Sequence, residues 1–151
     1  MRVALGNDHA GFPAKDVLID FLRKEGIDYE YCGSDSDAPV DFPEITKAVC
    51  ARVVSGGADR GILLCGTGVG ASIAANKISG IRAVVGHDLF SARQGVEHDD
   101  ANVLCLGAWI VGAEIMRLSL NEFLNARFSE NPDFRRRVRM LHEMDRARQE
   151  A

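Results

Sequence analysis

The sequence predicts an α/β fold, a doubly wound five-stranded parallel sheet with helices on both faces in a Rossmann-like three-layer sandwich. Short apolar runs alternate along the chain with segments whose apolar residues recur at helical spacing. The clearest run, Gly61–Cys65, is apolar throughout, which is typical of a strand covered on both faces. Strands that alternate with helices form right-handed βαβ units, and these build a parallel sheet.

The expected elements follow one another without an internal repeat or a linker. Strands are predicted over residues 2–6, 29–32, 61–65, 82–86 and 103–106. Helices are predicted over residues 12–24, 42–53, 71–77, 89–96, 112–127 and 131–150. The last helix is expected to begin at Asn131-Pro132, which supplies a capping side chain and then a proline at the first helical position. A single domain over residues 1–151 is therefore expected.

The composition excludes several classes of protein. A hydrophobic fraction of 46% is ordinary for a globular fold, and no apolar run approaches the length of a membrane span. The formal net charge of -4 argues against nucleic acid as a partner. The N-terminus has no secretory signal, and the four cysteines form no CxxC pair. A cytoplasmic protein with free thiols is expected.

Polar residues and glycines stand where four predicted strands end. In open parallel sheets, ligands bind beyond these carboxyl ends. The four segments are Asn7-Asp8-His9, Cys65-Gly66-Thr67, His87-Asp88 and Gly107.

The segment Cys65-Gly66-Thr67-Gly68-Val69-Gly70 carries the strongest chemical signal. Three glycines at alternate positions open a helix directly after a buried strand, so backbone N–H groups can approach an anion. Such surroundings favour a thiolate, which makes Cys65 a candidate general base or nucleophile. An inert core cysteine is the alternative, and the position at the strand end disfavours it.

The same glycines admit a second interpretation. Gly66-x-Gly68-x-x-Ala71 fits a dinucleotide-binding fingerprint, with Asp88 near the expected position of a ribose-binding acid. That fingerprint usually follows the first strand, whereas here it follows the third. The chain also lacks room for a substrate domain beside a six-stranded nucleotide fold, so this interpretation is disfavoured.

Three more residues could transfer protons or bind hydroxyl groups. Asp8 and His9 end the first strand, and His98 precedes the fifth. Taken singly, Asp8 would cap a turn and His98 would lie in a solvated polar loop. Together with a thiol and an anion-binding loop they favour proton abstraction next to a carbonyl. No histidine forms a spaced ligand pair with a cysteine, so no metal is expected.

The residues quoted so far resemble the ribose-5-phosphate isomerase B and galactose-6-phosphate isomerase family. The resemblance extends from the first strand to Arg127 with little gapping. It is carried by the motifs Asp8-His9-x-Gly11, Cys65–Gly70, Ser72–Lys77, Gly80–Ala83 and His98-x-Asp100-Ala101-Asn102. The resemblance implies a doubly wound parallel sheet, no metal or organic cofactor, and a homodimer or dimer of dimers with active sites at the subunit interface. It also implies that the C-terminal helix, 131–150, packs on the partner subunit.

The resemblance further implies an aldose–ketose isomerase of a phosphorylated sugar. Cys65 would move a proton between C1 and C2 of the open-chain sugar through an enediol. Thr67 and the backbone of Gly66, Gly68, Val69 and Gly70 would stabilise the enediolate oxygen. His98, supplied by the neighbouring subunit, would open the sugar ring. Asp99 and Arg137 would bind the substrate, and Asp8 and His9 would hold sugar hydroxyl groups or assist ring opening.

Three positions depart from the family pattern. Asp99 stands where the family usually has Asn, and a carboxylate can only accept hydrogen bonds. Trp109 and Asp133 stand where the family usually has arginines that help bind phosphate, although the second arginine of the C-terminal pair matches Arg137. The hypothesis is that the proton-transfer residues are kept and the phosphate end is remodelled for ribose 5-phosphate or a related tetrose, pentose or hexose phosphate. A sugar-phosphate binding or regulatory protein that has lost turnover is the alternative.

Overall fold

The computed structural model describes residues 1–150, with side chains through residue 147. The strands are β1 (Arg2–Asn7), β2 (Asp28–Tyr31), β3 (Arg60–Cys65), β4 (Ala83–Val85) and β5 (Val103–Gly107). They form one parallel sheet in the order β2-β1-β3-β5-β4, so the five-stranded parallel prediction is confirmed.

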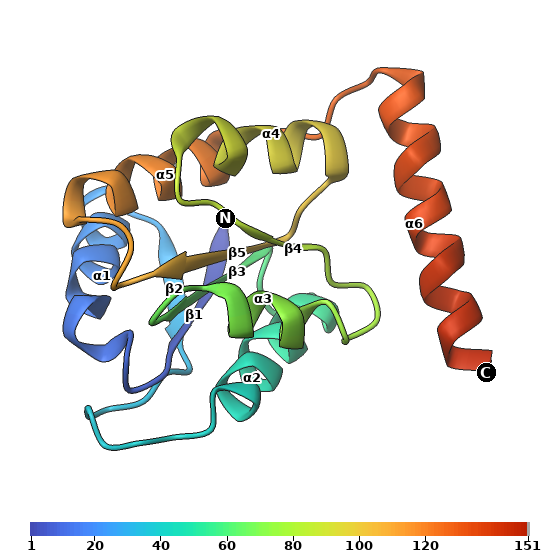
Figure 1. Ribbon diagram of the computed structural model, residues 1–151. Helices are drawn as coiled ribbons and strands as arrows, with labels where there is room; N and C mark the ends of the chain where they lie inside the picture. The colour runs from blue at the N-terminus through green and yellow to red at the C-terminus, as the bar shows by residue number, and fades with distance from the viewer. Residues whose placement is uncertain (151) are drawn as a thin grey trace.

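Helices cover both faces of the sheet (Figure 1). The helices α1 (Lys15–Lys24), α4 (Leu89–Asp99) and α5 (Ala113–Asn125) pack on one face through a core cluster centred on Leu5, Leu104 and Phe123. The helices α2 (Phe42–Val54) and α3 (Val69–Ala75) cover the other face through Val49, Leu63 and Ala71. The central strands β3 and β5 are buried almost throughout, which explains their unbroken apolar sequence.

Two predicted boundaries are wrong in an informative way. The helix expected from residue 12 begins with a separate 3-10 turn, η1 (Phe12–Ala14), which contains Pro13. The helix expected to end at 96 continues to Asp99, so His98 lies in its last turn and not in a polar loop. That helix ends at Asp100, whose φ of 51° is left-handed, a conformation that aspartate tolerates better than most residues.

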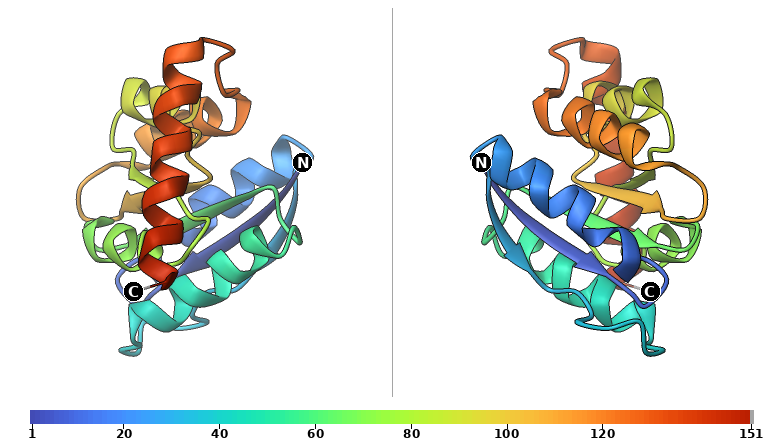
Figure 2. Two further views of the ribbon diagram at one scale, coloured as in Figure 1. Left: turned by 90° about the vertical axis from the view of Figure 1, so that its right-hand side faces the viewer. Right: turned by 90° about the vertical axis from the view of Figure 1, so that its left-hand side faces the viewer.

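The last helix, α6 (Pro132–Glu150), stands outside the sandwich beside the edge strand β4 (Figure 2). The Asp145 carboxylate accepts hydrogen bonds from the Ser79 hydroxyl, at 2.8 Å, and the Gly80 N–H, at 2.7 Å. These contacts join the C-terminal part of α6 to the turn before β4. No helix in residues 1–150 is long and apolar enough to cross a bilayer.

Candidate active site

The strand order reverses direction between β1 and β3, and the predicted Asp8 and Cys65 follow these two strands. In doubly wound sheets this switch point opens a crevice at the carboxyl edge. The Asp8 N–H donates to the Leu64 carbonyl at 3.2 Å, which ties the two strand ends together. Gly11 is required here because a Cβ would lie 2.1 Å from the same carbonyl oxygen.

Asp8 and His9 are both held in place by backbone N–H groups. Asp8 is 7% exposed, and its carboxylate accepts the Gly11 N–H through Oδ1 at 2.9 Å. Within the described residues no hydrogen bond reaches its Oδ2. The His9 ring accepts the Val40 N–H at Nδ1 over 3.2 Å, which leaves Nε2 as its free ring nitrogen. Asp8 therefore caps the turn, as expected, and keeps one oxygen available.

The Cys65 thiol ends β3 at the same edge. The Gly68 N–H donates to Cys65 Sγ at 3.0 Å, a contact that stabilises a thiolate. Gly68 has a φ of 77°, so a residue with a side chain would be strained where this N–H turns back onto sulfur. The other cysteines lack this partner. Burial raises the pKa of Cys50 to about 11 and that of Cys105 well above its ordinary value.

The glycine loop is fastened to the end of β5. The Cys65 carbonyl accepts the Ala108 N–H at 2.8 Å, and the Gly66 carbonyl accepts the Trp109 N–H at 2.9 Å. The indole of Trp109 lies against Gly66, where a Cβ would be 2.7 Å from the ring, yet it is 72% exposed. The residue in place of the expected arginine therefore flanks the loop. Within the loop, the Thr67 hydroxyl accepts the Val69 N–H at 3.3 Å.

His87, which the sequence interpretation left without a role, lies beneath this loop. Its Nε2 is buried without a hydrogen-bond partner in the described part of the chain, and it faces the Cα of Gly68. Burial lowers the pKa of His87, with a smaller opposing effect from Asp88. Asp88 itself caps α4 by accepting the Ser91 N–H at 2.7 Å. This use of the carboxylate weakens the dinucleotide interpretation further.

His98, Asp99 and Arg137 lie at the opposite edge of the sheet from Cys65. Because α4 runs antiparallel to the strands, its last turn reaches the edge where β5 begins. The chain therefore brings Asp8, His9 and the loop Cys65–Gly70 together, and it separates them from His98. The separation follows from the direction of α4 and not from any local distortion.

Several hydrogen bonds fasten the end of α4, and they account for two motifs that the sequence left without a role. The Arg82 guanidinium pairs with the Asp100 carboxylate at 2.7 Å and donates from Nε to the Asp100 carbonyl at 2.7 Å. Asn102 accepts the Arg82 N–H at 2.8 Å and donates to the Gly80 carbonyl at 2.8 Å. The Ser129 N–H donates to the Glu97 carbonyl at 2.9 Å. These contacts hold His98 on a rigid support.

The arginines of α6 differ in their partners. Arg135 pairs with Glu130 at 2.6 Å, and Arg136 pairs with Asp133 at 2.7 Å. Arg137 makes no ion pair within the described residues, and its guanidinium lies 5.9 Å from the centre of the Phe134 ring. The acidic residue at 133 therefore engages Arg136 and leaves Arg137 as the available cation of the three.

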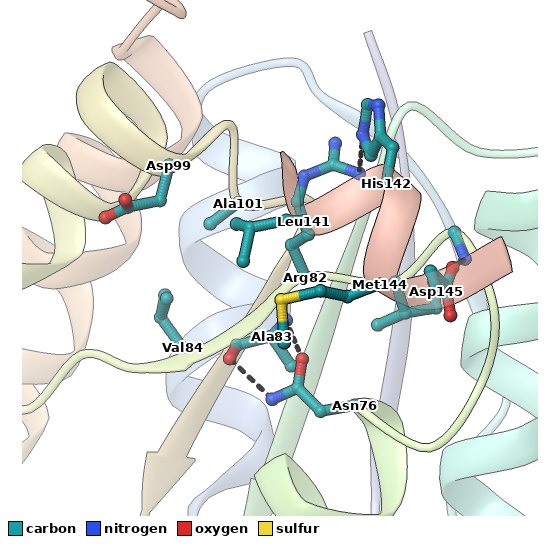
Figure 3. A pocket seen from close by; sticks show the side chains of 12 residues that line it. Asn76, Arg82, Ala83, Val84, Asp99, Ala101, Leu141, His142, Met144 and Asp145 are labelled. Carbon is teal, nitrogen blue, oxygen red and sulfur yellow. Dashed lines mark hydrogen bonds between the residues drawn. The ribbon is translucent and has the colours of Figure 1, made fainter. Parts of the chain in front are cut away.

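The cavities beside the candidate residues differ in size. The cavity that touches Asp8 and Cys65 measures about 10 Å³, which is too small for a sugar phosphate. A pocket of about 320 Å³ lies between α6 and β4, lined by Val84, Asp99, Leu141 and Met144 among others (Figure 3). No cluster of three or more potential metal-ligating side chains occurs among residues 1–147.

The fold and this arrangement define a class of enzyme. A thiol under a backbone N–H, beside a carboxylate at the switch point of a parallel sheet, is suited to moving a proton on a small anionic substrate. Residues 3–141 match the sequence model of the ribose/galactose isomerase family, and the chain belongs to this family. It is an aldose–ketose isomerase of a phosphorylated sugar.

Known relatives agree with this assignment. The chain is 40% identical over 127 residues to ribose-5-phosphate isomerase B of Escherichia coli, covering 84% of this chain and 85% of that protein. It is 38% identical over 132 residues to D-erythrulose-4-phosphate isomerase 2 of Mycolicibacterium smegmatis, covering 85% and 86%. The structure of Clostridium thermocellum ribose-5-phosphate isomerase B superposes with a TM-score of 0.94 at 39% identity, covering 97% of this chain and 99% of that one.

Proposed function

We propose that Cys65 is the base that interconverts aldose and ketose. The thiolate takes the proton from C2 of the open-chain aldose, the C2–H electron pair forms the C1=C2 bond, and the negative charge moves to O1. The O2–H proton then passes to O1, which moves the negative charge to O2. As the C2=O2 carbonyl forms, the C1=C2 electron pair takes the proton from the Cys65 thiol at C1, and the ketose and the thiolate result. The observation that carries this proposal is the 3.0 Å hydrogen bond from the Gly68 N–H to Cys65 Sγ. Asp8 and His9 would hold the sugar hydroxyl groups. Thr67 and the backbone of Gly66 and Gly70 would face the enediolate oxygen, while the N–H groups of Gly68 and Val69 hold Cys65 Sγ and the Thr67 hydroxyl in place.

The active site in this proposal is shared between two copies of the chain. His98 and Asp99 of one copy complete the site around Cys65 of the other, because α4 carries them to the far edge of their own sheet. Val69 and Ile73 of α3 are 52% and 58% exposed next to the loop, and Leu141 and Met144 of α6 are 41% and 66% exposed. A homodimer, or a dimer of dimers, would cover these apolar side chains.

The phosphate end is the part of the site that we propose to be remodelled. Arg137 would bind the phosphate of a substrate in the partner's site, and Asp99 would accept a sugar hydroxyl. Trp109, beside Gly66, would face the substrate where a cation is common in the family. Relatives named for a pentose and for a tetrose phosphate share similar identity with this chain. The substrate is therefore ribose 5-phosphate or a related tetrose, pentose or hexose phosphate.

Residues 1–151 would form a single isomerase domain in the cytoplasm, with the C-terminal helix, 131–150, packing on the partner. Neither a cofactor nor nucleic acid enters this proposal. The experiment that tests it measures isomerisation of tetrose, pentose and hexose phosphates by the wild-type chain and by Cys65→Ala. Cys65-dependent turnover of one sugar phosphate is expected. Sugar-phosphate binding without any turnover would favour the regulatory alternative instead.

A further inference from the structure

His98 is held by two side chains that the shared mechanism does not use. Gln94, one turn earlier on α4, places its amide nitrogen 2.9 Å from His98 Nδ1. Phe134, in the first turn of α6, stacks on the imidazole with ring centres 3.9 Å apart and planes inclined by 21°. The linker between α5 and α6 is bonded to the end of α4 through Ser129 and Glu97, so the stack joins two elements that are already in contact (Figure 1).

We propose that Gln94 and Phe134 are positioning residues that set His98 for opening the sugar ring, an inference that rests on the proposed function. Gln94 occupies Nδ1 and leaves Nε2 as the ring nitrogen that meets the substrate. An amide offers both a donor and an acceptor, so with its oxygen turned to Nδ1 Gln94 accepts a hydrogen bond from Nδ1–H, the tautomer in which Nε2 is free to take a proton. Nδ1 keeps this hydrogen bond when Nε2 is protonated. Phe134 fixes the plane of the imidazole and hence the direction of Nε2.

In the ring-opening step, His98 both accepts and returns one proton. Nε2 takes the proton of the anomeric hydroxyl and gives it to the ring oxygen as the bond from C1 to that oxygen breaks. The electron pair of the broken bond goes to the ring oxygen, and the C1=O1 carbonyl forms. His98 ends the step as it began. A shift of about 1 Å in such a catalytic group can cost about a hundredfold in rate.

The experiment separates ring opening from proton transfer at carbon. Ribose 5-phosphate is a furanose and needs ring opening, whereas ribulose 5-phosphate is acyclic because O5, which would close the ring on C2, carries the phosphate. We would measure isomerisation of ribose 5-phosphate and, by NMR in D₂O, exchange of the C1 proton of ribulose 5-phosphate. The exchange needs Cys65 but no ring opening.

Gln94→Leu and Phe134→Leu are expected to lower kcat for ribose 5-phosphate by about tenfold to a hundredfold, with exchange within about twofold of wild type. Phe134→Tyr keeps the stack and should restore kcat. Phe128→Leu is the matched control, because Phe128, in the linker before α6, lies against the guanidinium of Arg135, whereas the ring stacked on His98 is that of Phe134. Its two rates should equal those of the wild type.

Two results would overturn the inference. An equal fall in both rates would show that Phe134 and Gln94 support only the fold or the dimer, and an unchanged kcat would show that His98 needs neither. If the proposed function itself is wrong, the two rates will show a different pattern. In that case the wild type would exchange and isomerise no faster than Cys65→Ala, whatever residue stands at 94 or 134.

Discussion

A mixture of two inactive variants tests whether one copy of the chain lends His98 to the other. Cys65→Ala removes the proposed base, and His98→Asn removes the proposed ring-opening residue. Each variant alone should have little activity on a furanose phosphate. If the site is shared, a dimer containing one copy of each has one site with both substitutions and one site with neither.

The expected recovery follows from counting subunits. Random pairing of equal amounts gives about half mixed dimers, and each has one intact site of two, so the mixture should recover about 25% of wild-type activity. The assay is ribose 5-phosphate isomerisation after joint unfolding and refolding of the two variants. Recovery should rise to about 50% when mixed dimers are isolated with two different affinity tags.

The control is refolding of each variant separately, followed by mixing immediately before the assay, which should give no recovery. A dimer of dimers gives the same fractions, because sites still form between pairs. Absence of recovery in isolated mixed dimers would refute the reasoning, since it would mean that Cys65 and His98 act within one chain despite lying at opposite edges of its sheet.

Three further outcomes are expected. Trp109→Arg, which places a cation beside Gly66, should lower KM for ribose 5-phosphate by about tenfold, and titration of the wild type should change the fluorescence of Trp109, the only tryptophan. An unchanged KM would place the phosphate elsewhere. Iodoacetamide near neutral pH should label Cys65 before Cys50, since burial raises the pKa of Cys50 to about 11, and substrate should slow the labelling. Peptide mapping that shows equal labelling would contradict this. Burial lowers the pKa of His87 in the folded state, so its contribution to stability is complete above an unfolded pKa of about 6.5 and is lost as the pH falls below it. His87→Gln should therefore flatten the acid side of the urea-midpoint curve, and parallel curves for the two proteins would argue against the assignment.

The sequence predicts the fold well because its signals are local and periodic. The strand Gly61–Cys65 and the apolar spacing in residues 112–127 fix their elements without knowledge of tertiary contacts. The errors fall at helix ends, where tertiary contacts decide. The residues Glu97–Asp100 do not predict that Arg82 stabilises the end of α4. The ion pair between Arg82 and Asp100 joins residues that are 18 positions apart in the chain. The end of a helix such as α4 depends on contacts between residues far apart in the chain, and the spacing of apolar residues does not reveal such contacts.

The carboxyl-edge half of the candidate site was predictable for a topological reason. Parallel strands end at one edge, so Asp8 and the loop Cys65–Gly70 must be neighbours once their strands are adjacent. His87 also ends a strand at that edge, but its burial beneath Gly68 depends on side-chain packing that spacing does not reveal. The contact of Trp109 with Gly66 was equally hidden, because a residue after a strand can turn toward either neighbour.

The position of His98 connects the same topological rule to the proposed dimer. A residue just before the fifth strand of a parallel sheet lies at the amino edge, and Cys65, just after the third, lies at the carboxyl edge. An active site that needs both residues therefore needs two chains, whatever the details of side-chain packing. The two side chains that hold His98, Gln94 and Phe134, differ in how far they lie from it in the sequence. Gln94 lies one turn away on the same helix, but Phe134 comes from α6, 36 positions later. This chain thus places its thiol loop at one edge of the sheet and His98 with Arg137 at the other. Substitutions at the second edge should accordingly change which sugars are accepted more than they change the proton transfer itself.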